Sequence, residues 1–491
     1  MYLLNLAMKT QRRFRNRVML RFRASDRKNR IAFLLFLILL CCFTYFNHET
    51  GGWNENARLL TTYSILEKHV INIDPYVDQT KDTVEINSHI YGDKAPGTAM
   101  LALIPMGVYW AVMKSFRKEN PSFLAFQIIS RWTLSSLPAA LMGVAVYWVA
   151  LSLGVSEAAA IFAAIGFGLA SPIWPFATFL FSHILATTFT FFAFALALRI
   201  RRLNSCAPLP RAAIELGLCA GLAFATEYTT PPACILIIAI AYSRMRWKNM
   251  LRPVAATLLG LLPGLFLVSL HNFLLSGSPF TLPYTYHQND RWAEMSNGFF
   301  GLSYPKFWVL WEITFGKARG LFLISPIFTI AIVGLMSLIR ERATRAVGVW
   351  SVLIVVYFFA MNASYYYWDG GSSLGPRHCI PALPFLALGL AAAFDACKRT
   401  RWLSIAFLSL LVFSILVQIF FVSERPLPSF GTVIVQFLDV MNLFVHGEVH
   451  SQNAGNLLGL TEIWSLLPLA LICVFLGRLI YKSQRDPVFS K

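Results

Sequence analysis

The chain has 491 residues, of which 57% are hydrophobic and 13% are charged, whereas an average soluble domain is about 25% charged. Its polar side chains are too few to cover a water-soluble globule, so the composition excludes a soluble protein and predicts one embedded in lipid. The formal net charge of +18 does not indicate a nucleic-acid partner, because the basic residues lie in short clusters typical of the cytoplasmic ends of membrane helices. These clusters are residues 11–30, 199–202, 243–248, 340–345, 397–401 and 481–485.

The chain begins with a basic segment, residues 1–30, which we expect on the cytoplasmic side in contact with anionic lipid. An apolar stretch at 31–47 follows, and no small-residue cleavage site comes after it, so we expect a retained first membrane helix. The loop 48–96 would then lie outside the cytoplasm. The eight cysteines show no C-x-x-C spacing, so neither a disulfide framework nor a zinc site is predicted.

Residues 31–491 predict a single integral-membrane domain, all-α and polytopic, with about 11–13 transmembrane helices. Further helices are expected at 132–152, 157–177, 182–199, 211–227, 229–243, 253–275, 320–339, 346–362, 379–396, 402–423 and 463–480. Every later basic cluster falls inside only if the apolar segment 97–114 does not cross fully, so we expect it to dip into the outer leaflet or lie along it. The alternative is a full crossing there, with one crossing fewer between 157 and 199.

In this arrangement the outer face holds nearly all the non-basic polar residues. It collects a catalytic loop at 48–96, substrate loops at 276–319 and 363–378, the loop 424–462, His183 and the Glu227-Tyr228 pair. In the first loop, Glu55 and Arg58 stand three residues apart at an expected helix start, which puts them on one helical face. A purely structural alternative is an acid that favours the helix dipole, together with a surface ion pair.

The first loop ends in a second charged motif, Asp93-Lys94-Ala-Pro, with Asp82 shortly before it. Pro96 favours a helix start here, and Lys94 beside the open N–H groups of that start would suit an anionic oxygen. The alternatives are a lysine that extends to the lipid interface, and a solvated loop carboxylate at Asp82.

The third outer loop combines aromatic side chains, glycines and a cation. Tyr367 and Trp368 fit an interfacial aromatic belt, Asp369 follows, and Arg377 and His378 stand at the mouth of the next helix. An arginine there can bind a phosphate with two hydrogen bonds in a way that lysine cannot. The structural alternative is a glycine-rich turn with an anchoring arginine.

Weaker signals come from the outer ends of two other expected helices. His183 starts one helix, where a lone histidine is more often a packing residue, and Glu227-Tyr228 lies between two apolar spans, where acids are rare and usually functional. His183, Glu227 and His378 could together bind a divalent metal, but their wide sequence separation does not by itself indicate a metal site.

These motifs resemble those of a known family. The stretch "ENAR" (55–58) is similar to an acid-x-x-Arg motif, "DKAPG" (93–97) to an acid-Lys-x-Pro motif, and 368–384 to a late motif of the GT-C glycosyltransferases. The nearest resemblance is to bacterial relatives of the dolichyl-phosphate-mannose–protein mannosyltransferases (family 39) and to the lipid A aminoarabinose transferases. It implies a multi-pass enzyme of the cell (inner) membrane, active in cell-envelope glycan synthesis.

The resemblance implies a sugar transfer from a polyprenyl phosphate to a lipid, glycan or protein outside the cytoplasm, with inversion at C1. Glu55 would be the base, with Asp93 or Asp82 as rivals because glutamate and Asn56 depart from the family motif. Arg58, Lys94 and Arg377 would bind the donor phosphate. The substrate contacts would be Asp82, His183, Glu227, Tyr228, Tyr367, Trp368, Asp369 and His378.

No resident cofactor is predicted, and the altered acidic motif leaves dependence on a divalent metal open. The alternative functions are a flippase or transporter of lipid-linked glycans, or a ligase of them. A transporter is expected to carry charges near the middle of its helices, whereas the charges here cluster in outer loops, which favours the transferase.

Overall fold

The computed structural model describes residues 26–49, 51–117, 120–203, 209–287 and 292–485. Most of the predicted cytoplasmic segment 1–30 therefore lies outside the described residues. The helices and strands are the helix at 26–44, β1 (Phe46–Asn47), α2 (Gly52–Lys68), β2 (Thr83–Ile86), β3 (His89–Gly92), α3 (Gly97–Arg117), α4 (Phe123–Arg131), α5 (Leu137–Ser152), α6 (Glu157–Leu169), α7 (Ile173–Ala177), α8 (Ser182–Leu203), α9 (Leu209–Thr226), α10 (Pro231–Tyr242), α11 (Leu251–Ser276), α12 (Phe307–Thr314), α13 (Leu321–Ile324), α14 (Phe328–Arg340), α15 (Arg345–Ser364), α16 (Leu383–Cys397), α17 (Arg401–Glu424), α18 (Val433–Val445), β4 (Gln452–Asn453) and α19 (Leu467–Arg485). Short 3₁₀ turns lie at Asp74–Gln79, Trp247–Asn249, Pro283–Tyr286, Ala293–Ser296, Arg377–Ala382, Asn456–Leu458 and Glu462–Leu466, and a π-helical turn at Trp132–Ser136 joins α4 to α5.

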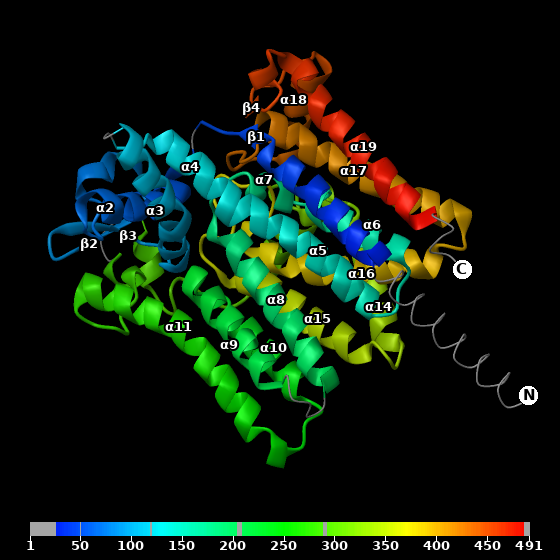
Figure 1. Cartoon of the computed structure of the whole chain (residues 1–491), viewed down its shortest axis with the longest axis horizontal. Helices are drawn as coiled ribbons and strands as arrows, with labels where there is room; N and C mark the ends of the chain where they lie inside the picture. The colour runs from blue at the N-terminus through cyan, green and yellow to red at the C-terminus, as the bar shows by residue number, and fades with distance from the viewer. Residues whose placement is uncertain (1–25, 50, 118–119, 204–208, 288–291, 486–491) are drawn as a thin grey trace, which may run out of the picture.

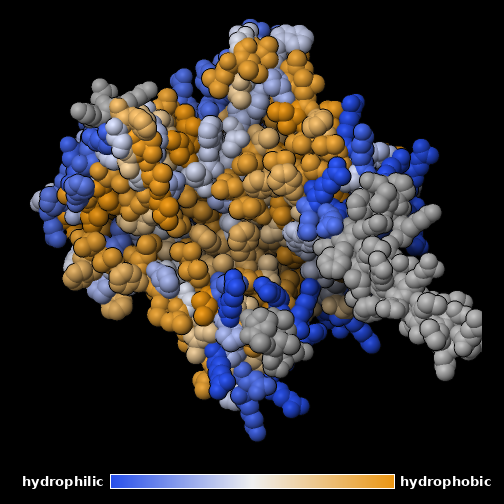
Figure 2. All heavy atoms as spheres, viewed as in Figure 1, coloured by the Kyte–Doolittle hydropathy of each residue, from blue (hydrophilic) through white to orange (hydrophobic). Residues whose placement is uncertain are grey.

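The protein is an all-α, multi-pass membrane protein, as predicted. Within the described residues, nine helices are long and apolar enough to cross a membrane, and four shorter helices are also apolar. Figure 2 shows apolar side chains over most of the visible face, with hydrophilic ones gathered mainly toward the ends of the helices. Because the shorter helices are not long enough to count by themselves, the figure of 11–13 crossings stays a prediction.

Two helices predicted as continuous are broken, and those predictions were wrong. The segment 157–177 divides into α6 and α7 at Pro172, and the segment 320–339 divides into α13 and α14 at Pro326. Proline has no N–H to donate to the preceding turn and its ring crowds that turn, so a helix cannot run on through it without a kink or break. The expected helix at 132–152 is instead longer, since α4, the π turn and α5 form one span from Phe123 to Ser152.

The segment predicted not to cross is a single helix, α3. Its exposed apolar side chains recur every four residues and form one stripe along the helix: Ile104, Val108, Val112 and Phe116. Residues four apart lie on the same helical face, so this stripe faces lipid. The helix is long and apolar enough to span a membrane, and a shallow course in the outer leaflet remains a prediction.

Helices α9 and α11 pack with their backbones in close contact. A Cβ at Gly221 would lie 2.7 Å from the carbonyl oxygen of Leu261, and one at Gly264 would lie 2.1 Å from the carbonyl oxygen of Gly221. Small residues four apart let membrane helices approach this closely. This contact fixes the outer end of α9, which carries Glu227 into the site (Figure 1).

The first and last parts of the described chain meet at the end of the fold where the first helix stops. Strand β1 pairs with β4 in antiparallel register, with Phe46 opposite Asn453. Below this pair, Cys42 Sγ in the first helix lies 3.6 Å from Cys473 Sγ in α19, and Figure 1 shows the first helix beside α17 and α19. The late loop between α17 and α19 is thereby held against the start of the first outer loop.

Candidate active site

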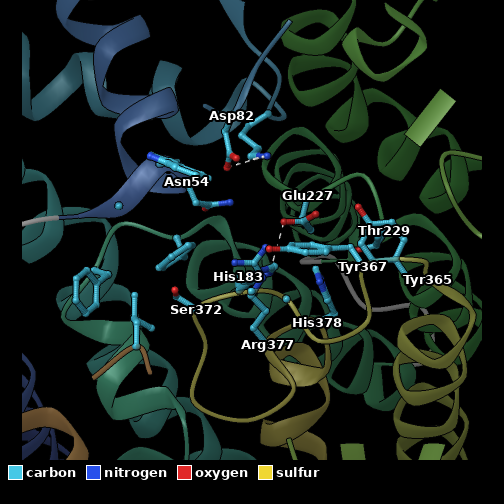
Figure 3. A pocket seen from close by; sticks show the side chains of 18 of the residues that line it. Asn54, Asp82, His183, Glu227, Thr229, Tyr365, Tyr367, Ser372, Arg377 and His378 are labelled. Atoms are coloured by element: carbon cyan, nitrogen blue, oxygen red, sulfur yellow. Dashed lines mark ion pairs between the residues drawn. The ribbon is translucent and has the colours of Figure 1, made fainter. Parts of the chain in front are cut away.

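The ends of several helices surround one cavity of about 1340 Å³. Its walls come from α2, the starts of α8 and the 377–382 turn, the link after α9, the loop between α11 and α12, and the end of α15 with the loop that follows it. Of the residues predicted for the site, those that line the cavity are Arg58, Asp82, Lys94, His183, Glu227, Tyr228, Tyr367, Arg377 and His378. Figure 3 shows Asp82, His183, Glu227, Tyr367, Arg377 and His378 around the same space.

A β-hairpin places the lysine of the first loop. Strands β2 and β3 pair through a turn at Asn87 and Ser88, both with positive φ, the geometry that two-residue hairpins require. Thr83 therefore faces Gly92, and the residues that flank the strands come together: Lys94 Nζ lies 3.0 Å from Asp82 Oδ2 and 2.9 Å from Asp93 Oδ1. The hairpin thus brings Asp82 and Asp93, which are eleven positions apart in the chain, to the same lysine.

Electrostatics keep this lysine charged. Burial acts to lower the pKa of the Lys94 ammonium, but the carboxylates of Asp82 and Asp93 outweigh burial, and the pKa is raised. Burial acts to raise the pKa of Asp93, but Lys94 and a hydrogen bond with His287 hold it at about 2. Asp93 does not line the cavity and is 1% exposed, so it contacts Lys94 on the buried side, away from the cavity.

A second hydrogen-bonded chain crosses the cavity from α2 to α9. Arg58 donates to the Asn54 side chain at 2.6 Å and to Ser182 Oγ at 2.8 Å. Ser182 in turn donates to Glu227 Oε2 at 2.6 Å, and His183 Nδ1 lies 3.5 Å from the same oxygen. The charges of Arg58 and Glu227 are therefore linked through one hydroxyl group.

The third cation of the cavity, Arg377, is held by aromatic rings. Its guanidinium carbon lies 5.7 Å from the Phe181 ring centre and 5.8 Å from that of Tyr367. Its buried Nε has no hydrogen-bond partner, and no carboxylate in the described part of the chain pairs with it. The rings orient the guanidinium through cation–π contacts and leave its N–H groups available to an anion.

The loop after α15 presses against this arginine. Gly370 and Gly371 both have positive φ, and a Cβ at Gly370 would lie 2.9 Å from Arg377 Nε. A buried arginine, Arg319, donates from Nε to the carbonyl oxygen of Asp369 at 2.9 Å and from Nη2 to that of Gly371. The glycines and Arg319 thus fix the backbone that carries Tyr367 toward Arg377.

His378 and Tyr228 complete the predicted lining. The His378 ring meets those of His183 and Tyr365 edge-on, at 5.4 Å and 5.2 Å between ring centres, and its buried Nε2 has no hydrogen-bond partner. The Tyr228 ring packs edge-on against Tyr284 at 5.7 Å. Burial raises the pKa of the Tyr228 hydroxyl well above its ordinary value, so this group stays protonated.

Glu55 does not reach the cavity, contrary to its predicted role. Its side chain is fully buried, Oε1 accepts from Arg131 Nε at 2.8 Å, and Oε2 accepts from the backbone N–H of Leu180 at 2.9 Å. Both oxygens therefore serve packing between α2, α4 and the start of α8. The neighbouring Asn54 faces the cavity in its place.

Two residues of the late motif also lie outside the cavity lining. Trp368 packs edge-on against Trp308 at 5.3 Å and Phe430 at 6.0 Å. The Asp369 carboxylate accepts the backbone N–H of Gly371 at 3.1 Å, so it stabilises the turn.

The structure offers no donor set for a metal. Among the described residues, no three His, Cys, Asp or Glu side chains gather closely enough to hold an ion. His183 and Glu227 are close, but His378 meets His183 edge to face rather than sharing a centre with both. Metal dependence remains a prediction that these residues do not support.

Several functional candidates were missed by the sequence analysis. Asn54 and Ser182 each precede a predicted residue by one position and supply the hydrogen bonds of Arg58, and His450 and Glu424 line the far end of the cavity. Polar residues four apart on α2, Asn54 and Arg58, were a readable signal. The pair Glu424–His450 had none, since it forms across a long loop.

The fold and the site define an all-α, multi-pass membrane protein with one charged cavity at one end of its helices. The solved structure of ArnT from Cupriavidus metallidurans in the apo state matches this fold with a TM-score of 0.50 and 16% identity, over 91% of this chain and 71% of that one. At this identity the likeness concerns the fold alone. It confirms the GT-C-like fold that the motifs predicted.

Two further solved structures resemble the chain with TM-scores below 0.5. ArnT of the same organism bound to undecaprenyl phosphate gives 0.48, at 14% identity over 92% of this chain and 75% of that one. The oligosaccharyltransferase AglB from Archaeoglobus fulgidus, in complex with an inhibitory peptide and a dolichol-phosphate, gives 0.44, at 12% identity over 87% and 56%. No protein-family model matches the sequence, and a search of the curated proteins gives no match.

Proposed function

We propose that the protein is a glycosyltransferase that moves a sugar from a polyprenyl-phosphate donor to a lipid, glycan or protein acceptor. The observation that carries the proposal is the set of three cations, Arg58, Lys94 and Arg377, around one cavity in a membrane protein. Arg377 lacks a carboxylate partner among the described residues and presents its N–H groups between two rings. Such a fork can bind a phosphate with two parallel hydrogen bonds.

The cavity also has a side suited to the prenyl chain. Pro231 and Pro232 from the start of α10 line it opposite Tyr357, Ala360 and Met361 from α15. These side chains offer apolar contact next to the cations. A lipid-linked phosphate needs this combination, because its charged group and its hydrocarbon chain are adjacent.

The charge pattern along the helices supports an extracytoplasmic site. Helices that bring a residue to the cavity at one end carry basic residues at the other: α8 runs from Ser182 to Arg201 and Arg202, and α17 runs from Arg401 to Glu424. Basic ends favour the cytoplasm. The cavity would therefore open on the far side of the cell (inner) membrane, with the N-terminus inside.

The reaction breaks the bond between C1 of the sugar and the phosphate oxygen, and the electron pair leaves with the polyprenyl phosphate. Arg377, Lys94 and Arg58 stabilise the charge that develops on this leaving group, an effect that is large where donors are preorganised away from water. The acceptor oxygen bonds to C1 on the opposite face and transfers its proton to a carboxylate. One displacement of this kind inverts the configuration at C1.

We assign the base to Asp82, because Glu55 and Asp93 do not line the cavity and Asp82 does. Asp82 is paired with Lys94 at 3.0 Å in the free protein. A donor phosphate that binds Lys94 competes for this charge and frees the carboxylate to accept a proton. Asp93 then acts as a positioning residue, since it retains Lys94 from its buried side. Glu227, linked to Arg58 through Ser182, is a further carboxylate of the lining.

The test is transfer or hydrolysis of a labelled polyprenyl-phosphate sugar by the purified full chain in lipid nanodiscs. Asp82→Asn is expected to lower turnover by about 10²–10⁴-fold, the usual contribution of a positioned base, with donor binding retained. Arg377→Lys is expected to weaken binding of polyprenyl phosphate by about tenfold, because a point charge does not replace the two-bond fork. Asp78→Asn, an exposed carboxylate of the same loop, is the control.

Two results would contradict the assignment. Wild-type turnover in Asp82→Asn together with loss in Glu227→Gln would move the base to Glu227. Binding of the donor without any bond cleavage, accompanied by movement of the intact donor across a bilayer, would identify a flippase instead.

A further inference from the structure

The cavity extends beyond the cations to a second polar end that the proposed transfer step does not use. This end is formed by residues 47–49 after the first helix, residues 424–430 after α17, and residues 450–452. The whole cavity, at about 1340 Å³, exceeds the roughly 300–1,000 Å³ of a pocket for one drug-sized ligand. It has room for an acceptor group beside the donor sugar.

The second end is rigidly built. The β1–β4 pair brings Gln452 opposite Asn47, and Ser451 donates its N–H to the carbonyl oxygen of Ser423 at 2.8 Å and its hydroxyl to that of Val422 at 2.9 Å. The backbone that directly follows His450 is thereby fixed to β1 and to the end of α17. A loop tied in this way can hold a side chain in one orientation.

His450 and Glu424 form the polar centre of this end. His450 Nδ1 lies 2.5 Å from Glu424 Oε2, and the His450 side chain, which lines the cavity, is 60% exposed. The Glu424 side chain is fully buried, and its other oxygen, Oε1, has no hydrogen-bond partner. A buried carboxylate oxygen without a donor is costly, and a ligand O–H or N–H would remove that cost.

We propose that the end of the cavity centred on His450 and Glu424 is the acceptor site of the transferase, and that it takes a hydroxyl-rich sugar without phosphate groups. This inference rests on the proposed function. The imidazole and the carboxylate offer one donor and several acceptor positions, the groups that orient sugar hydroxyls. The incoming hydroxyl would enter between this pair and the cations.

The charge at this end selects the class of acceptor. Its acidic side chains are Glu49, Glu424 and, 3.6 Å from His450 Nε2, Glu448; the basic ones are the exposed Arg425 and, when protonated, His450. With His450 neutral, the two carboxylates that line this end, Glu49 and Glu424, outnumber its lining arginine, Arg425. A phosphorylated acceptor is therefore repelled here, whereas a neutral or amine-bearing sugar is accepted.

The experiment uses the full chain in nanodiscs with a labelled polyprenyl-phosphate sugar and defined acceptors. These are a neutral alkyl glycoside, its amino-sugar and 6-phosphate analogues, a soluble disaccharide, and a serine- and threonine-containing peptide. His450→Ala and Glu424→Gln are expected to raise the KM for the neutral alkyl glycoside by about tenfold or more, the loss of one charge-assisted hydrogen bond. Donor hydrolysis and polyprenyl-phosphate binding should not change.

The matched control is His446→Ala, an exposed histidine of the same loop that contacts only the backbone of Asn442. Preference for the alkyl glycoside over the disaccharide would identify a lipid head group, and the reverse a free glycan; both support the site. An unchanged acceptor KM in both site variants, or a preference for the 6-phosphate analogue or the peptide, would overturn the acceptor site and leave the proposed function standing. A wild-type chain that binds no polyprenyl phosphate would overturn the proposed function and this site with it.

Discussion

The carboxylate of Glu55 is bound by Arg131 and by the Leu180 N–H in a place that water does not reach. Glu55→Gln removes the charge and leaves the Arg131 guanidinium buried beside a neutral amide. Loss of one partner of a buried ion pair costs about 3–5 kcal/mol, so this variant is expected to unfold at a clearly lower temperature in detergent. Thermal unfolding followed by size-exclusion chromatography measures this.

Two comparisons make the Glu55 result specific. Glu215→Gln breaks the exposed pair with Arg211 on α9 and should leave the unfolding temperature nearly unchanged, since exposed pairs contribute little. Asp82→Asn should lose turnover at a normal unfolding temperature. A Glu55→Gln protein with normal stability but no turnover would return Glu55 to the catalytic role.

At individual positions, the sequence identified the charges of the site better than their roles. The cations at 58, 94 and 377 were predicted to share a cavity, and they do. Glu55 was misassigned because its partner, Arg131, is 76 residues away, and no local spacing announces such a pair. Asn54, one position earlier, was overlooked because the 55–58 motif was identified by its charged residues, and an amide carries no charge.

Among the helices, the closest packing lies between α9 and α11. Gly221→Leu would place a side chain against the backbone of Leu261, because a Cβ added at position 221 would lie 2.7 Å from the Leu261 carbonyl oxygen. The helices must separate, so we expect a marked drop in the yield of monodisperse protein and loss of the Glu227 position. Size-exclusion chromatography of a fluorescent fusion measures the yield.

The matched substitution is Gly477→Leu in α19, where no atom lies within 4 Å of the added Cβ. Both changes put the same residue into an apolar helix, so only the packing differs. Equal yields from the two variants would mean that the α9–α11 contact does not hold the outer ends of these helices in place.

Element boundaries were predictable where the chain signals them and not elsewhere. Pro172 and Pro326 were visible breaks, and the helices at 157–177 and 320–339 should have been divided there. Gly217, Gly221, Gly260 and Gly264 also repeat at four-residue spacing, a readable sign of close helix packing. By contrast, the register of β2 against β3, which brings Asp82 to Lys94, depends on which face of a short hairpin packs inward.

Across the whole molecule, the first and last helices are joined at two levels. The Sγ atoms of Cys42 and Cys473 lie 3.6 Å apart, 431 positions apart in the chain. A membrane-permeant oxidant such as iodine should link these two thiols readily, because no helix movement is needed. Mass spectrometry of the digested protein should find the Cys42–Cys473 peptide in large excess over any peptide joined through Cys41.

Cys473→Ser removes the link and serves as the control. In the described part of the chain, the neighbouring Cys41 makes no hydrogen-bond contact with Cys473, so it tests whether the reaction follows geometry rather than exposure. Formation of both links at similar rates would mean that the first and last helices do not hold a fixed register.

The overall architecture could be read from composition and from the spacing of basic clusters, because lipid imposes both on any helical membrane protein. The path of the chain through the bilayer could not. Helices of 13 residues, such as α6 and α14, are set by their neighbours and by nearby prolines rather than by their own hydrophobicity. The position of His450 in the cavity wall likewise depends on contacts of its loop with β1 and with the end of α17, so no single segment of the sequence indicates it.

The pairing of β1 with β4 has a consequence for biogenesis. During synthesis, Phe46 reaches the membrane long before Asn453. Strand β1 therefore stays unpaired until the segment that contains β4 has been made. During that interval the donor half of the cavity can assemble while one wall is still missing. For the proposed transferase, the acceptor end of the cavity would be complete only after Asn453 has paired with Phe46, so acceptor selection would begin later than donor binding.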